Sequence, residues 1–253
     1  MVKGLSIKFR SYEETVPQVL KLIKLDAELK KHGRIVLKPS LRIDMAQGTS
    51  LPFVESVVKF CLAHKNPGAE ILIAEGANGA STASLFEAQG YGALAERYGI
   101  SLVDLNKAEC DAIGSNDFMS FEQIMYPSLL RESFVISLPA LKNDEVIEME
   151  GAVSNMRGAY PAKYYKGFFS SQKNKLDDFP ITHQIHDILM CKMPDLALID
   201  AHEKGVILAG RPIDMDKQAA KILGLDWRSV GYLRILEETL AKKQPQEQPM
   251  DER

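Results

Sequence analysis

Three acidic residues each come directly after a short, mostly apolar run in this sequence. Glu75, Asp104 and Asp200 follow the runs 71–74, 100–103 and 196–199. Consecutive apolar residues are typical of strands that are buried on both faces of a parallel sheet. In open α/β sheets, ligands bind outside the carboxyl ends of the strands. We therefore expect a site rich in carboxylates at this edge, and whether the three converge depends on the order of the strands.

Lys38 is predicted to end an earlier strand and so to lie at the same edge. Pro39 follows it and favours an extended backbone there, which fixes the direction of the lysine. The ammonium group could bind an anion, pair with Glu75 or exchange protons. A solvated strand end is the alternative interpretation.

The loop Glu75-Gly76-Ala77-Asn78-Gly79-Ala80-Ser81-Thr82 joins a predicted strand to a predicted helix. Gly76 and Gly79 allow backbone N–H groups to approach a ligand closely. Ser81 or Thr82 can cap the helix, whose N-terminus favours a phosphate or carboxylate. The loop matches neither the P-loop nor the GxGxxG pattern, so an ordinary strand–helix turn is the alternative.

Further candidates lie beyond the strand predicted at 134–138. Lys142 and Asn155 follow it, and Arg157 offers a planar fork that suits carboxylate or phosphate. A surface loop explains these residues equally well from composition alone.

Two histidines and two aspartates complete the set of candidates. His183 and His186 are three residues apart on a predicted helix, a spacing that occurs at metal sites but also in ordinary packing. Asp214 is predicted to cap a helix that starts at Met215, with Asp216 in its first turn. A binding role at the same edge is the alternative for both aspartates.

The elements that must position these residues alternate between strands and helices. Strands are predicted at 5–9, 34–38, 70–74, 100–104, 134–138 and 196–200, and helices at 12–31, 52–64, 82–89, 182–190, 215–223 and 229–241. This order predicts an α/β fold with a mostly parallel sheet, flanking helices and right-handed crossovers. Residues 140–180 are predicted to form an inserted excursion over the active edge. We expect one domain over residues 1–241 and a disordered tail over 242–253.

Within those elements, three features are expected from local residue chemistry. Pro17 should lie in the first turn of its helix, Gly33 should end that helix, and Thr182 should cap the helix that follows the excursion.

Composition limits the possible functions. The chain has 253 residues and a net charge of -3, which points to neither nucleic acid nor an anionic membrane surface. No apolar run approaches the ~20 residues that span a bilayer, and no secretory signal is evident, so a cytoplasmic location is expected. The three cysteines contain no CxxC pair, so the chain encodes no iron–sulfur or zinc site of its own.

The motifs, taken in order, resemble the domain of unknown function family 362 (DUF362) over roughly residues 34–240. The resemblance rests chiefly on Lys38-Pro39, Ala74-Glu75-Gly76, Leu138-Pro139, Val153-Ser154-Asn155-Met156-Arg157-Gly158 and the segment 210–216. Members are often fused to, or encoded with, ferredoxin-type modules, which implies an iron–sulfur cluster supplied by a partner. The N-terminal half is more faintly similar to lactate racemases, in which a pincer nickel cofactor binds between two domains.

Two departures from the family pattern affect what the resemblance implies. Ser40 stands where the family commonly has Asn, and Lys142-Asn143-Asp144 stands where it has Lys-Thr-His. Loss of that histidine weakens a metal or proton-transfer role for the segment.

The preferred hypothesis is an enzyme that binds a small anionic metabolite at the carboxyl edge of the sheet. Glu75, His183 and Asp200 would supply acid–base groups or bind a divalent metal. The residues expected to bind the anion or cofactor are Lys38, Gly76, Gly79, Lys142, Asn155, Arg157 and Asp214. The alternatives are a redox subunit with a ferredoxin-like partner and a binding module without catalysis.

Overall fold

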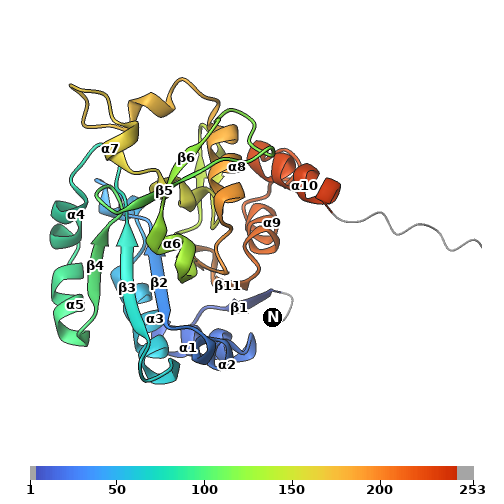
Figure 1. Ribbon diagram of the computed structural model, residues 1–253. Coiled ribbons are helices and arrows are strands. Elements are labelled where there is room, and N and C mark those ends of the chain that lie inside the picture. The colour runs from blue at the N-terminus through green and yellow to red at the C-terminus, as the bar shows by residue number, and fades with distance from the viewer. Residues whose placement is uncertain (1–3, 244–253) are drawn as a thin grey trace, which may run out of the picture.

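A sheet of seven strands forms the centre of the protein. The structure is a computed structural model that describes residues 4–243 (Figure 1). In spatial order the strands are β1 (Leu5–Lys8), β11 (Val206–Gly210), β10 (Leu196–Ala201), β7 (Phe134–Leu138), β2 (Arg34–Pro39), β3 (Glu70–Glu75) and β4 (Ser101–Asp104). The five strands from β10 to β4 are parallel, whereas β11 runs antiparallel to both of its neighbours, β10 and β1. The predicted α/β fold with a mostly parallel sheet is confirmed.

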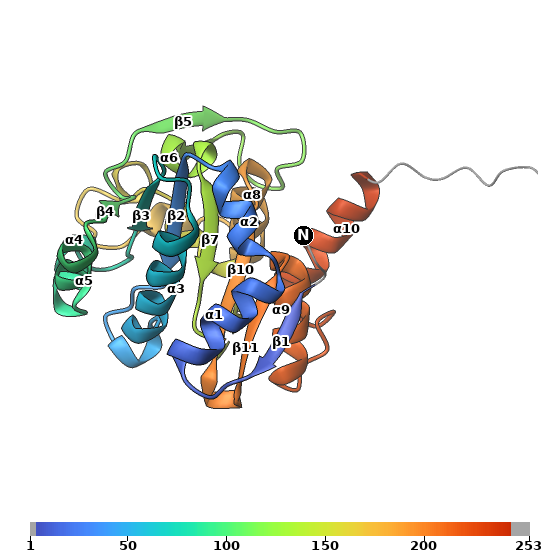
Figure 2. The same ribbon diagram turned by 90° about the horizontal axis from the view of Figure 1, so that it is seen from below.

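Helices cover both faces of the sheet, because its central strands are apolar on both sides. Ile35 and Leu37 of β2 pack into one core cluster and Val36 into the other. One face carries α1 (Tyr12–Leu22), α2 (Leu25–Glu28), α3 (Leu51–His64), α4 (Thr82–Ala88) and α5 (Tyr91–Tyr98). Figure 2 shows α1 and α3 side by side on this face.

The opposite face is covered by later elements. They are α6 (Ser128–Glu132), the 3₁₀ segment η3 (Ser154–Ala159), α8 (Ile181–Cys191), α9 (Pro212–Ile222) and α10 (Gly231–Lys243). Two short antiparallel pairs lie outside the main sheet: β5 (Cys110–Ile113) with β6 (Ile124–Pro127), and β8 (Lys142–Asp144) with β9 (Glu148–Glu150). In Figure 1, β3 and β4 point towards the yellow segment that contains α7 (Ala162–Tyr165), so part of the excursion lies beyond their carboxyl ends.

Several helix boundaries differ from those expected. The helix predicted over 12–31 ends at Leu22, because Lys24 is left-handed (φ 61°), and the chain resumes in α2 and a 3₁₀ turn before Gly33. Ser11 caps α1 by accepting from the Glu14 N–H, so Pro17 lies inside the helix rather than in its first turn.

The later helices also start elsewhere than predicted. Helix α8 begins at Ile181 after Pro180, so Thr182 is inside it and is not a cap. Helix α9 begins at Pro212 with Arg211 at the N-cap, which places Asp214 in the first turn. Pro212 explains this start, because proline is favoured at the first helical position. Helix α10 reaches Lys243, two residues into the expected tail, and 244–253 lie outside the described residues.

Candidate functional site

A buried ion pair joins the ends of two neighbouring strands. Lys38 of β2 is fully buried and its Nζ lies 2.6 Å from Glu75 Oε2, at the end of β3. The second Glu75 oxygen accepts from the Gly76 N–H at 2.8 Å. Burial lowers the pKa of Lys38, and the Glu75 carboxylate opposes that effect. The lysine is therefore held in place by a carboxylate, and it does not extend into solvent.

Asn155 connects this pair to the segment η3 above the sheet. Lys38 Nζ donates to the Asn155 carbonyl at 2.6 Å, and the Asn155 amide donates back to the Lys38 carbonyl at 2.9 Å. The same amide lies 3.0 Å from Ser137 Oγ of β7. These contacts fix η3 over the ends of β2 and β7.

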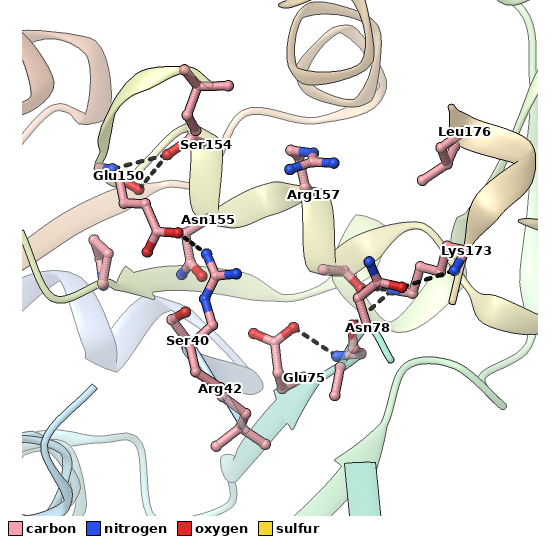
Figure 3. Close-up of a pocket in the computed structure, with 17 residues that line it drawn as sticks. Ser40, Arg42, Glu75, Asn78, Glu150, Ser154, Asn155, Arg157, Lys173 and Leu176 are labelled. Carbon is pink, nitrogen blue, oxygen red and sulfur yellow. Dashed lines mark hydrogen bonds and ion pairs between the residues drawn. The ribbon is translucent and has the colours of Figure 1, made fainter. Parts of the chain in front are cut away.

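A pocket of about 100 Å³ opens between η3, the ends of the strands and the loop after β3. It is lined by Ser40, Leu41, Arg42, Glu75, Gly76, Ala77, Asn78, Pro139, Ile147, Glu150, Gly151, Ser154, Asn155, Arg157, Gly158, Lys173 and Leu176. Figure 3 shows Arg42, Glu75 and Arg157 entering the region from three separate segments. Because pockets for drug-sized ligands span ~300–1,000 Å³, this one suits a small molecule.

Arg157 has hydrogen-bonding capacity left over in this pocket. One terminal nitrogen donates to Gln184 Oε1 at 3.2 Å, while its buried Nε has no hydrogen-bond partner among residues 4–243. Burial, followed by the nearby charge of Arg42, lowers the pKa of Arg157. A buried donor without a partner costs about 1–3 kcal/mol, so the position of Arg157 is held at a cost to stability.

Lys173 forms another wall of the pocket. Its Nζ donates to the Gly76 carbonyl at 2.7 Å and lies 3.4 Å from the Gly158 carbonyl. Burial lowers the pKa of this lysine to about 7, and the charges of Lys38 and Arg157 act in the same direction.

Positive charge exceeds negative charge around the pocket. Arg42, Arg157 and Lys173 line it and Lys38 lies directly behind Glu75, whereas the lining carboxylates are Glu75 and Glu150. Arg42 forms an ion pair with Glu150. The remaining basic groups give the pocket a surplus of positive charge, which favours an anionic ligand.

Asp216 binds the backbone immediately before η3. It is fully buried in α9, and its two oxygens accept from the Ala152 and Val153 N–H groups at 2.6 and 3.0 Å. A side chain at Gly151 would overlap this carboxylate, with a Cβ placed 2.6 Å from its Oδ2. Asp216 therefore fixes the backbone that leads directly into Ser154 and Asn155.

We expect Asp216→Asn to destabilise the protein by about 2–3 kcal/mol, because an amide would turn a donor towards one of the two N–H groups. Burial raises the pKa of the carboxyl to about 7, although the backbone bonds oppose this. A raised pKa contributes stability below the unfolded value near 4 that is lost as pH rises through about 7. The difference in free energy of unfolding between the wild type and Asp216→Asn should therefore be largest near pH 4 and should shrink towards pH 7.

Urea unfolding of both proteins across this pH range measures the effect. Asp214→Asn is the matched control, since Asp214 is in the same turn of α9 but is partly exposed and pairs with Arg211 at 3.6 Å. A deficit that is constant with pH would contradict the prediction.

The structure brings together only part of the predicted site. Glu75, Gly76, Asn155 and Arg157 line the pocket, and Lys38 lies behind Glu75. Three predicted binding residues lie outside the lining. Gly79 has φ +77° in the same loop, Lys142 donates to the Ala46 carbonyl, and Asp214 lies on the surface of α9.

His183 and Asp200 also lie outside this pocket. His183 Nδ1 lies 2.8 Å from Ser120 Oγ, in the segment between β5 and β6. Asp200 on β10 accepts from the Tyr12 hydroxyl at 2.8 Å and lies 3.0 Å from His202 Nδ1. Two strands separate β10 from β3, so the strands that carry Asp200 and Glu75 lie about 14 Å apart across the sheet. By contrast, Asp104 is the register partner of Glu75 on the edge strand β4.

The part of the chain that the structure describes offers no group of three His, Cys, Asp or Glu side chains that could hold a metal ion. His186 pairs instead with Asp187 at 2.6 Å and with Thr239 at 2.9 Å. Between residues 4 and 243, no helix is long and apolar enough to cross a membrane.

Sequence reasoning missed Arg42, Glu150 and Lys173. Arg42 lies in a polar loop, Glu150 is in a three-residue strand, and Lys173 is in a lysine-rich stretch with no periodic apolar pattern. For Lys173 one signal was available: residues 140–180 are predicted to lie over the active edge, which makes a basic residue there a candidate.

The fold and the pocket define an α/β protein with a small basic pocket at the carboxyl edge of a mostly parallel sheet. The chain belongs to the family described as "Domain of unknown function (DUF362)", whose model matches residues 35–220. No curated protein matches the sequence.

A solved structure shares this fold. The lactate racemase apoprotein from Thermoanaerobacterium thermosaccharolyticum is similar with a TM-score of 0.59 and 14% identity, over 87% of this chain and 57% of the racemase. A protein from Thermotoga maritima is more weakly similar, with a TM-score of 0.47 and 13% identity over 87% of this chain and 61% of its own. This chain thus spans less than two thirds of either protein.

Proposed function

We propose that the pocket binds a small anionic metabolite through Arg157, Lys173 and the loop after β3, as an enzyme that uses Glu75 for proton transfer. The observation that carries this proposal is the Arg157 guanidinium, which lines the pocket and makes one hydrogen bond, to Gln184, among the described residues. A carboxylate or phosphate would complete the hydrogen bonds of a guanidinium better than a neutral ligand would.

Proton transfer is supported by the arrangement of Glu75. Its Oε2 contacts the Lys38 ammonium at 2.6 Å, and the side chain also lines the pocket. A carboxylate beside a bound molecule can accept a proton when the geometry permits direct contact. The paired lysine would stabilise the charged form of Glu75 between turnovers.

The other functions suggested by the sequence make different demands on this chain. A redox subunit would depend on a cluster that a ferredoxin-like partner supplies, and a divalent metal would need a ligand set, whereas no three His, Cys, Asp or Glu side chains of residues 4–243 are grouped to hold one. A binding module without catalysis would use the same pocket, and it differs from the enzyme only in the absence of turnover.

Isothermal titration with inorganic phosphate and with glycolate tests the proposal. Arg157→Met should weaken binding of the better probe by about 10- to 100-fold, because a hydrogen bond to a charged group contributes about 1.5–3 kcal/mol. The thermal stability of this variant should not fall, because a buried cation without an anionic partner is removed.

Arg97→Met is the matched control, since Arg97 is an exposed arginine that pairs with Glu55 on the opposite face of the sheet. Its affinity for both probes should equal that of the wild type. Equal affinity of Arg157→Met and wild type, or no measurable binding of either probe to the wild type, would overturn the proposal.

A further inference from the structure

Lys173 is a buried lysine that has no carboxylate partner among residues 4–243. Only 4% of the residue is exposed, and its Nζ contacts the carbonyl oxygens of Gly76 and Gly158. Lys38 differs in this respect, because Glu75 neutralises it. Burying a charged ammonium group without a counter-ion is unfavourable, because the charge loses its hydration. Burial therefore favours the neutral amine form of the lysine.

The loop after β3 fixes the position of this amine at the pocket wall. The Lys173 backbone N–H donates to Asn78 Oδ1 at 2.8 Å, while its side chain reaches back to the Gly76 carbonyl at 2.7 Å. Lys173 is thus attached to the loop both through its backbone N–H and through the Nζ at the tip of its side chain. Figure 3 shows Asn78 beside Lys173 in the pocket wall.

The charges around Lys173 act together with its burial. Lys38 and Arg157 disfavour a third positive charge, whereas Glu75 and Asp104 favour it. The outcome is a pKa of about 7, so a large share of the side chain is an uncharged amine at neutral pH. Desolvation beside other cations is a known means of making a lysine nucleophilic.

We propose that Lys173 forms an imine with a small 2-oxo acid whose carboxylate is bound by Arg157. The inference rests on the proposed anion site, and it names the class of ligand as a molecule with both a carboxylate and a neighbouring carbonyl. Both residues line the same small pocket. Arg157 would orient the carboxylate, and Lys173 would attack the adjacent carbonyl carbon.

The reaction is a condensation without oxidation or reduction. The Nζ lone pair forms a C–N bond as the carbonyl π-bond breaks, and one proton passes from nitrogen to oxygen to give a carbinolamine. Loss of the hydroxyl group with a second nitrogen proton, as water, gives the imine. Glu75 is the pocket carboxylate that could carry these protons.

Reductive trapping with glyoxylate and cyanoborohydride tests the inference on the full-length protein. Peptide mass mapping should locate the reduced adduct at Lys173 at neutral pH, because an amine with a pKa near neutrality reacts faster there than an ordinary solvated lysine side chain. The rate of adduct formation should increase as pH rises through about 7. Lys173→Arg and Lys173→Met should lose the adduct, and Lys175→Arg, at an exposed lysine two residues away, should retain it.

Glycolate, which has the carboxylate but no carbonyl, separates the two proposals. If glycolate binds and protects Lys173 from trapping, the adduct forms in the anion site, as we infer. If glycolate binds but no adduct forms at Lys173, the imine is overturned and the anion site stands. If an adduct forms equally at many lysines and glycolate does not compete, the reaction is non-specific and the inference fails.

Discussion

Lys38→Met should lower the free energy of unfolding by about 3–5 kcal/mol, the cost of removing one member of a buried ion pair. Lys38 is fully buried and Glu75 is 4% exposed, so the variant leaves the Glu75 carboxylate in a site that water scarcely reaches. The variant also removes the donor that binds the Asn155 carbonyl at 2.6 Å. Urea unfolding measures the loss.

A double variant distinguishes the unpaired charge from the loss of packing. In Lys38→Met/Glu75→Gln, the amide oxygen can still accept from the Gly76 N–H and no charge remains buried, so more than half of the lost stability should return. Lys8→Met, at an exposed position of β1, should change stability by no more than about 0.5 kcal/mol. Additive single effects in the Lys38 and Glu75 variants would show that the two side chains do not act as a pair.

This pair also shows what the sequence could predict. Lys38 is next to last in β2 and Glu75 is last in β3. The apolar runs before them indicate those strands, so the presence of both residues at one edge follows from the pattern alone. That the two strands are adjacent depends on the strand order, which a single sequence does not contain. The same order separates Asp200 from Glu75, since β7 and β2 lie between their strands.

The residues of the pocket that come from the excursion were harder to predict. Arg157 is a candidate because its guanidinium suits anions, but nothing in the sequence pattern distinguishes Arg157 or Asn155 from Lys142 nearby. Asn155 and Arg157 reach the pocket because they lie on the 3₁₀ segment η3. Hydrogen bonds with Lys38 and Asp216, which are far from η3 in the sequence, hold this segment over the strand ends. Lys173 depends in the same way on its contacts with Gly76 and Asn78.

Gly158→Ala should have the second large effect, because two glycines make the close approach of η3 and the loop after β3 possible. A Cβ at Gly158 would overlap Glu75 Oε1 and lie 2.7 Å from Lys38 Nζ, and a Cβ at Gly76 would overlap the Gly158 carbonyl oxygen. We expect a loss of about 3 kcal/mol, the upper end of the usual cost of overpacking, because the ion pair is displaced as well.

Gly158→Ala should also abolish binding of glycolate and phosphate, because moving η3 away from the strands carries Arg157 with it. The matched control is Gly33→Ala, where a Cβ meets no atom within 4 Å, and this variant should be unchanged or more stable by about 0.4–1 kcal/mol. Thermal unfolding of both variants measures the change in stability, and isothermal titration measures the binding of glycolate and phosphate. A Gly158→Ala protein with wild-type stability and binding would mean that η3 can shift freely above the strands, and the Lys38–Glu75–Asn155 contacts would then not be what positions Arg157.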